Sequence, residues 1–144
     1  MQTVSQILRT KGNAVYSIHP EASVYEALRL LAEKDIGALL VEEGEKLVGI
    51  FSERDYARKV ILHGKSSKET PIREVMTSRV IYVRPEQSLA ECMALMTDKR
   101  VRHLPVIQAG QVIGVISIGD VVKEIIAGQE FVIKQLENYI SGER

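Results

Sequence analysis

The apolar and polar positions of this chain follow the same order twice. When the sequence is shifted by 65 positions, so that Pro20 meets Pro85, residues 15–55 align with residues 80–120 without a gap. Most of the aligned positions are identical or pair one apolar residue with another. An internal repeat of this length predicts two structural units of the same kind.

Each copy begins with a short strand and an amphipathic helix. The β-rich runs 14–18 and 80–83 both end just before a proline. The Ser-x-x-Glu that follows is a capping box, in which the two side chains satisfy free backbone N–H groups at the start of a helix. Apolar residues then recur at i, i+3, i+4 and i+7, the spacing of one helical face. In the second copy this face includes the single cysteine, Cys92, which we expect in a core.

Two apolar strands and a second helix complete each copy. The runs 38–41 and 47–51 are separated by a five-residue break that contains a glycine, which predicts a β-hairpin. A Ser-x-x-Asp run then opens a helix that we expect to reach about residue 63 in the first copy and residue 127 in the second.

The repeat predicts an α/β fold of two pseudo-symmetric domains, each a small three-stranded sheet with two helices. Because one sheet face of so small a unit is poorly covered, we expect the copies to stack into one body. We place the first domain at residues 3–63, a linker at 64–70, the second domain at 71–127 and a C-terminal helix at 128–144.

The C-terminal segment has no counterpart in the repeat. Val132, Ile133, Leu136, Tyr139 and Ile140 form an apolar stripe on the predicted helix. The stripe could pack on its own domain or against a second chain, and the sequence leaves both possibilities open.

Composition and charge narrow the class of partner. The chain has 19 basic and 19 acidic residues, so it lacks the basic excess that usually attracts nucleic acid or anionic membranes. No apolar run approaches the ~20 residues of a membrane helix, and residues 1–12 lack the apolar region of a signal peptide. We therefore expect a cytoplasmic protein that binds neither nucleic acid nor a membrane.

The ordered set of motifs, present twice, resembles the CBS domain, named after cystathionine β-synthase. The resemblance covers about residues 3–127 and is nearest to stand-alone bacterial proteins made of one CBS pair. Besides the proline, the amphipathic helix and the duplication, its elements are Leu104-Pro105-Val106 and Gly114-x-x-Ser117-x-x-Asp120, matched by Leu39-Leu40-Val41 and the run from Gly49 to Asp55.

The resemblance implies a ligand as well as a fold. Proteins of this family usually dimerise into a flat disc and bind an adenine nucleotide, such as AMP, ADP, ATP or NAD, in the clefts between the repeats. The chain is then a regulatory adenine-nucleotide-binding module, a homodimer that signals to a separate protein partner. The alternative is a structural or partner-binding dimerisation module with no physiological nucleotide.

The two Ser-x-x-Asp runs are the strongest candidate binding residues. As helix caps they satisfy backbone donors and suit the helix dipole, which by itself could explain them. A carboxylate at a helix start that faces a cleft can also accept bonds from ribose hydroxyls, while the neighbouring N–H groups favour phosphate. In the CBS family the matching aspartate holds ribose, which indicates Asp55 and Asp120.

The densest basic patch runs from Lys99 to His103. It could be solvated charge at the end of a helix, or Arg102 and His103 could bind phosphate, as the matching basic pair often does in the family. The first copy has Gly37-Ala38 at this place, so we expect two unequal sites.

The resemblance implies that each cleft takes its Ser-x-x-Asp from one repeat and its entrance from the other. One cleft would join Thr10, Lys11, Ile36, Gly37 and Ala38 to Ser117, Gly119 and Asp120. The other would join Thr77, Val101, Arg102 and His103 to Ser52, Arg54 and Asp55.

An enzyme is the less favoured alternative. His103, Ser117 and Asp120 supply the residue types of a catalytic triad, but the sequence has no nucleophile elbow. The three histidines, His19, His63 and His103, lack the spacing of metal ligands. We therefore expect neither catalysis nor a bound metal.

Overall fold

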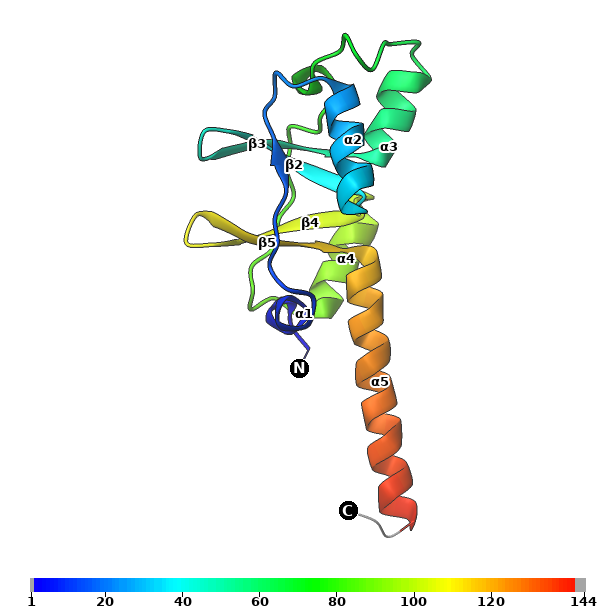
Figure 1. The fold of residues 1–144 in the computed structure, drawn as a ribbon. Coiled ribbons are helices and arrows are strands. Elements are labelled where there is room, and N and C mark those ends of the chain that lie inside the picture. Colours follow the sequence, from blue (N-terminus) through cyan, green and yellow to red (C-terminus); the bar gives the residue numbers. More distant parts are fainter. Residues whose placement is uncertain (1, 142–144) are drawn as a thin grey trace. The chain divides into compact units, whose positions relative to one another are not determined.

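The computed structural model describes residues 2–141, which form two compact units. The first-repeat unit comprises residues 15–81. The second-repeat unit combines residues up to 14 with the chain from residue 82 onward (Figure 1). The compact units therefore differ from the sequence repeats, because the segment that precedes each repeat belongs to the unit of the other.

The first-repeat unit is a three-stranded sheet covered by helices. The strand order is β1-β2-β3, with β1 parallel to β2 and β2 antiparallel to β3. Its core joins one face of α2 to apolar residues of β2 and β3, with Phe51 fully buried. The elements are β1 (Ser17–Ile18), α2 (Val24–Lys34), β2 (Ala38–Glu43), β3 (Lys46–Ser52), α3 (Glu53–Asp55), the π-helix η1 (Tyr56–Ile61) and the 3₁₀-helix η2 (Ile72–Glu74).

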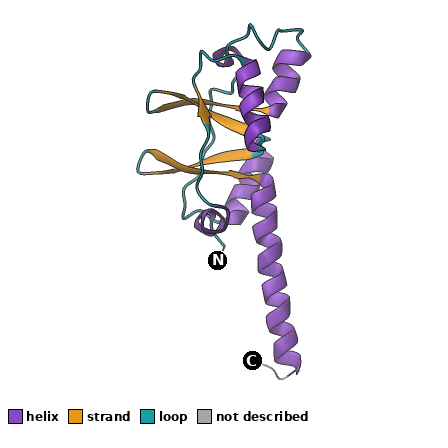
Figure 2. Ribbon diagram, in the orientation of Figure 1, coloured by secondary structure: helices purple, strands orange, loops and turns teal. Residues whose placement is uncertain are grey.

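The second-repeat unit contains the same hairpin and helix with one strand fewer (Figure 2). Strands β4 and β5 are antiparallel, and the buried face of α4 contributes Leu89, Cys92 and Met96 to the core. The mixed α/β class and the hairpins are as predicted. The elements are α1 (Val4–Lys11), α4 (Leu89–Lys99), β4 (His103–Gln108), β5 (Gln111–Ser117) and α5 (Ile118–Ser141).

The predicted strand at residues 80–83 is reduced to a single bridge between Val83 and Val106. In the first copy the Leu40 N–H donates to the Tyr16 carbonyl, at 3.1 Å, which extends the pairing of β1 with β2. The residue that corresponds to Leu40 is Pro105. Proline has no N–H to donate, so the equivalent bond cannot form and the edge strand is shortened.

Backbone hydrogen bonds attach each preceding segment to the start of the opposite helix. The N–H of Val4 donates to the carbonyl of Gln87, at 3.0 Å, and the N–H of Ile72 donates to that of Ala22, at 2.8 Å. Helix α1 was not predicted. Its sequence signal is a capping box in which Thr3 and Gln6 satisfy each other's backbone N–H groups.

Two predicted helix boundaries are wrong. Helix α5 runs without a break from Ile118 to Ser141, where we expected one helix to end near residue 127 and another to begin at 128. Gly128 is the residue at which we expected the two helices to be separated. A glycine within a helix costs about 1 kcal/mol relative to alanine, which is too little to end the helix here. Residues 142–144 of the predicted helix lie outside the described residues. In the first copy the helix ends as η1 at Ile61, close to the expected residue 63.

Substitution at Gly49 tests how tightly the segment before the second repeat packs on β3. A Cβ at Gly49 would lie 2.6 Å from Met76 Sδ and 3.0 Å from the carbonyl oxygen of Thr77. Because part of this contact is backbone, Gly49→Ala should lower the free energy of unfolding by about 1–3 kcal/mol in urea denaturation.

Gly114, the counterpart of Gly49, is the matched control. A Cβ there meets the flexible tip of Leu8, 2.6 Å from Cδ2, so Gly114→Ala should cost less. Equal costs for the two substitutions would contradict the contribution of the Thr77 backbone.

Candidate ligand-binding sites

In the second-repeat unit, the turn between β5 and α5 fixes the carboxylate of Asp120. The Ser117 N–H donates to Asp120 Oδ2, at 2.8 Å, and the Asp120 N–H donates to Ser117 Oγ, at 3.1 Å. This reciprocal cap satisfies two backbone donors and holds the carboxylate at the positive end of a 24-residue helix.

Lys11 at the end of α1 reaches this carboxylate from 109 residues away in the chain. Its Nζ lies 2.7 Å from Asp120 Oδ2 and 2.7 Å from the carbonyl oxygen of Val115. Burial by itself raises the pKa of Asp120, but the hydrogen bonds from Lys11 and Ser117 and the charge of Lys11 outweigh it. The pKa therefore lies below its ordinary value, and the carboxylate is ionised at neutral pH.

His103 and Arg102 complete the site in the same unit. His103 is the cross-strand partner of Ser117, and the Ile118 N–H donates to the Arg102 carbonyl, at 2.9 Å. Burial lowers the pKa of His103, the charges of Lys11 and Arg102 lower it further, and Asp120 acts in the opposite direction. A neutral imidazole beside two cations and one carboxylate leaves a net positive site.

In the first-repeat unit, Ser52 and Asp55 form the same reciprocal cap. The Ser52 N–H lies 2.9 Å from Asp55 Oδ2, and the Asp55 N–H lies 3.2 Å from Ser52 Oγ. Two further side chains converge on Asp55 Oδ1: the Thr77 hydroxyl donates to it at 3.2 Å, and Lys59 Nζ lies 3.0 Å away. Lys59 also lies 3.4 Å from the Thr77 hydroxyl.

The sequence analysis missed Lys59. It lies on η1, the π-helix that directly follows the cap, and its available signal was the i,i+4 spacing from Asp55. Its counterpart in the second copy is Glu124, so the two aspartates acquire their lysines from different elements. Asp55 is paired within its own helical segment, whereas Asp120 is paired by α1.

Three of the remaining predicted residues lie at the ends of helices. Thr10 donates its hydroxyl to the Gln6 carbonyl, at 3.2 Å, and so caps its own helix turn. Ile36 and Val101 each follow a helix that ends in a left-handed residue, Asp35 or Arg100.

Several predicted residues flank the Ser-x-x-Asp run of their own repeat. In the first-repeat unit, the Gly37 carbonyl accepts the Glu53 N–H, at 3.1 Å, and Ala38 pairs with Ser52. Arg54 is half-buried on α3, and Gly119 is exposed in the first turn of α5.

Of the predicted pairings, Lys11 does meet Asp120 and Thr77 does meet Asp55. His103, expected beside Asp55, pairs instead with Ser117 of its own repeat. That the other entrance residues of one repeat join the aspartate of the other stays a prediction.

Metal sites and membrane-spanning helices are two further features that residues 2–141 could contain. Within that range, no three or more His, Cys, Asp or Glu side chains gather as a metal site would require. None of the helices described is long and apolar enough to cross a membrane.

Two strand-helix-hairpin-helix copies, each with a capped carboxylate at the start of its last helix, define a tandem α/β repeat protein. The family model of the CBS domain matches residues 4–62 and 72–127. The chain belongs to the CBS-domain family, as its motifs predicted.

The relatives support this assignment over nearly the whole chain. A mitochondrial CBS domain-containing protein of Arabidopsis thaliana is 38% identical, over 97% of this chain and 72% of the relative. A solved protein with CBS domains from Burkholderia ambifaria is 54% identical, with a TM-score of 0.86 and coverage of 89% of this chain and 96% of that one. A CBS domain pair solved in complex with 5′-methylthioadenosine and S-adenosyl-L-methionine is 24% identical, with a TM-score of 0.76 over 90% and 98% of the chains, a likeness of fold.

Removal of the Lys11 charge tests the electrostatics of the second-repeat site. Lys11→Met should lower the free energy of unfolding at neutral pH by about 0.5–1 kcal/mol, because the Lys11 side chain is 39% exposed and solvent screens the pair. The pKa of Asp120 is lower in the folded chain than in the unfolded chain. The stabilisation that the ionised carboxylate gives to the fold is therefore complete above the unfolded pKa and is lost as pH falls through the folded pKa. The difference between variant and wild type should therefore shrink toward about pH 2.

Lys99→Met is the matched control, since Lys99 lies 3.6 Å from the exposed Asp98. Urea denaturation of both variants at the two pH values measures the effect. A cost for Lys11→Met that is the same in acid as at neutral pH would contradict the ion pair.

Proposed function

We propose that this chain is a regulatory module that binds an adenine nucleotide or a related adenosine compound and signals to a separate partner protein. The observation that carries the proposal is the Asp120 cluster, in which a capped carboxylate, Lys11 and His103 meet at the start of α5. Adenosine ligands of this type combine a ribose, which donates hydroxyl hydrogen bonds, with a charged substituent.

Each part of the cluster matches one part of such a ligand. The Asp120 carboxylate accepts hydrogen bonds from the ribose hydroxyls. The N–H groups of the first turn of α5 and the cations Lys11 and Arg102 attract a phosphate. The ribose competes with Lys11 for Asp120, so a bound ligand releases the lysine toward the phosphate.

The CBS pair solved with 5′-methylthioadenosine and S-adenosyl-L-methionine supports the adenosine part of the proposal. Both compounds contain adenosine, the part assigned here to Asp120, but they differ in charge from AMP, ATP and NAD. A screen must therefore include both kinds of compound.

We propose a binding role and not catalysis. Ser117 accepts the Asp120 N–H at 3.1 Å, which is the geometry of a cap and not of a serine activated by a base. Burial, with a smaller effect of Glu91, raises the pKa of Cys92 to about 11, so its thiol stays protonated and unreactive.

Loss of the Asp120 carboxylate tests the site. Asp120→Ala should weaken nucleotide binding about 10- to 100-fold, because hydrogen bonds to a charged group contribute about 1.5–3 kcal/mol. Calorimetry with AMP, ADP, ATP, NAD, S-adenosyl-L-methionine and 5′-methylthioadenosine measures the affinities.

The control is Asp98→Ala, at an exposed aspartate outside the cluster. Circular dichroism confirms that both variants fold. If no compound binds the wild-type chain, or if Asp120→Ala binds with unchanged affinity, the proposed site is wrong. The first of these results would favour the dimerisation module without a nucleotide.

His103 should make the affinity for a phosphate-bearing ligand depend on pH. Its pKa is lowered in the free protein, and an anion beside the ring favours the protonated form and raises that pKa. Binding then takes up a proton, so affinity for AMP should increase as pH is lowered from neutral.

The comparison with His103→Gln isolates this effect. The variant should bind AMP with less dependence on pH, and 5′-methylthioadenosine, which has no phosphate, should show little dependence with either protein. Identical pH profiles for the wild type and His103→Gln with AMP would remove His103 from the site.

A further inference from the structure

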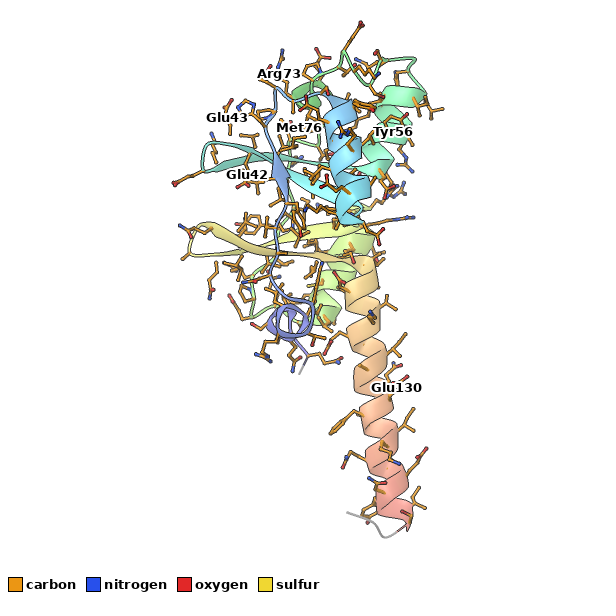
Figure 3. All side chains as sticks on the ribbon, viewed as in Figure 1. Glu42, Glu43, Tyr56, Arg73, Met76 and Glu130 are labelled. Carbon is orange, nitrogen blue, oxygen red and sulfur yellow. The ribbon has the colours of Figure 1, made fainter. Side chains whose placement is uncertain are left out.

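The second half of α5 carries apolar side chains that nothing in its own unit covers. From Gln129 to Ser141 every residue except Asn138 is exposed, and Tyr139 and Ile140 are each 84% exposed. Figure 3 shows Glu130 where α5 has already passed the other elements of the second-repeat unit. The possibility that the stripe packs back on its own domain is therefore wrong.

The uncovered face has the period of a coiled coil. Ile126, Ile133 and Ile140 are seven residues apart, and Val122, Gln129 and Leu136 repeat with the same period, four residues before each of them. These are the a and d positions of a heptad, and all six are exposed. The polar Gln129 lies at the centre of the series.

This seam is distinct from the face with which α5 packs on its own unit. That inner face includes Val121, which is fully buried, and Gly128, which lies against the side chain of Gln2. At 100° per residue, the a and d positions are rotated by about 110° from this face. The seam can therefore pair while α5 remains packed on its unit.

We propose that α5 pairs with α5 of a second copy of this chain, as a parallel two-stranded coiled coil from Val122 to Ile140. β-Branched isoleucine at all three a positions, with Leu136 at one d position, favours two parallel strands, and the paired Gln129 side chains fix the register. This inference does not depend on the proposed nucleotide site.

The polar Gln129 favours the parallel over the antiparallel arrangement. Parallel strands place d beside d, so Gln129 faces Gln129 of the partner and the two amides can hydrogen-bond. Antiparallel strands place d beside a, which sets Gln129 against an isoleucine and leaves the amide unsatisfied. The e positions hold Lys123, Glu130 and Glu137, and exposed pairs among them contribute little in either arrangement.

The exposed apolar area of the stripe is large enough for a contact between two helices. Five residues of the stripe, Val132, Ile133, Leu136, Tyr139 and Ile140, are between 54% and 84% exposed. Together they offer on the order of 600 Å² of apolar surface per chain. A standard interface buries about 800 Å² per partner, so the stripe supplies most of the area that such an interface needs.

Cysteine cross-linking of the full chain tests both the contact and its direction. The variants are Ile126→Cys and Ile140→Cys, two heptads apart on the seam. The control is Phe131→Cys, off the seam at an exposure between those of the two seam positions. A parallel pair brings each seam cysteine to its own copy, within the ~6 Å between Cα atoms that a disulfide requires. The native Cys92 is buried and does not compete.

Self-cross-linking of both seam variants, with little from the Phe131→Cys control, is the expected result. Antiparallel strands place each a position beside a d position and separate each seam cysteine from its own copy by more than the ~6 Å that a disulfide requires. Absence of cross-linking in both seam variants, or cross-linking of one alone, therefore overturns the proposal.

The oligomeric state provides an independent test. Light scattering should give a multimer for the wild type, and the double variant Ile133→Glu/Leu136→Glu should dissociate at a concentration at least tenfold higher than the wild type does. Phe131→Glu, off the seam, should behave as wild type. Because these side chains are exposed in the single chain, circular dichroism should show that all variants fold. A monomeric wild type, or a double variant with unchanged assembly, overturns the proposal.

Discussion

The backbone pairing of the first residues of the chain with the start of α4 is the constraint on which the second-repeat site depends. The N–H groups of Val4 and Ser5 donate to the carbonyls of Gln87 and Pro85, at 3.0 and 2.9 Å, and this pairing sets the position of α1. Only then can Lys11 reach Asp120. The ion pair itself is half-exposed and contributes at most about 1 kcal/mol, so it does not hold α1 in place. The ion pair instead determines the charge of the site at which a ligand would bind.

The same capping device begins several helices, yet only some of these caps form candidate sites. Ser88 and Glu91 cap α4 as Ser117 and Asp120 cap α5. The pKa of Glu91 is lowered by hydrogen bonds from Ser88 and Gln87. At Asp120 a lysine from another helix and a half-buried histidine are added. A reciprocal cap thus orients the carboxylate, and the residues brought to it by tertiary structure give it a binding function.

Local patterns in the sequence predicted the local elements, and long-range pairing decided the rest. The hairpins, the capped helices and the buried Cys92 follow from periods of two and 3.6 residues, which depend only on neighbours in the chain. The sequence indicated Asp120 through its capping pattern as well as the family resemblance, and Lys11 through the resemblance alone. It did not reveal α1, which packs on the opposite repeat, or Lys59, whose π-helix breaks the expected period. The loss of the edge strand beside β4 follows from one residue, Pro105, whose effect appears only once its pairing partner is known.

The different origins of the two lysines separate the roles of the two sites. Lys59 lies four residues after Asp55 and remains beside it however the rest of the chain moves. Lys11 reaches Asp120 from a separate helix, so a ligand that displaces it changes the contact between α1 and the start of α5. Such a change biases the protein only as far as the ligand prefers one arrangement over the other. Asp120 and the uncovered stripe lie on one continuous helix, so the second-repeat site, and not the first, shares an element with the proposed seam.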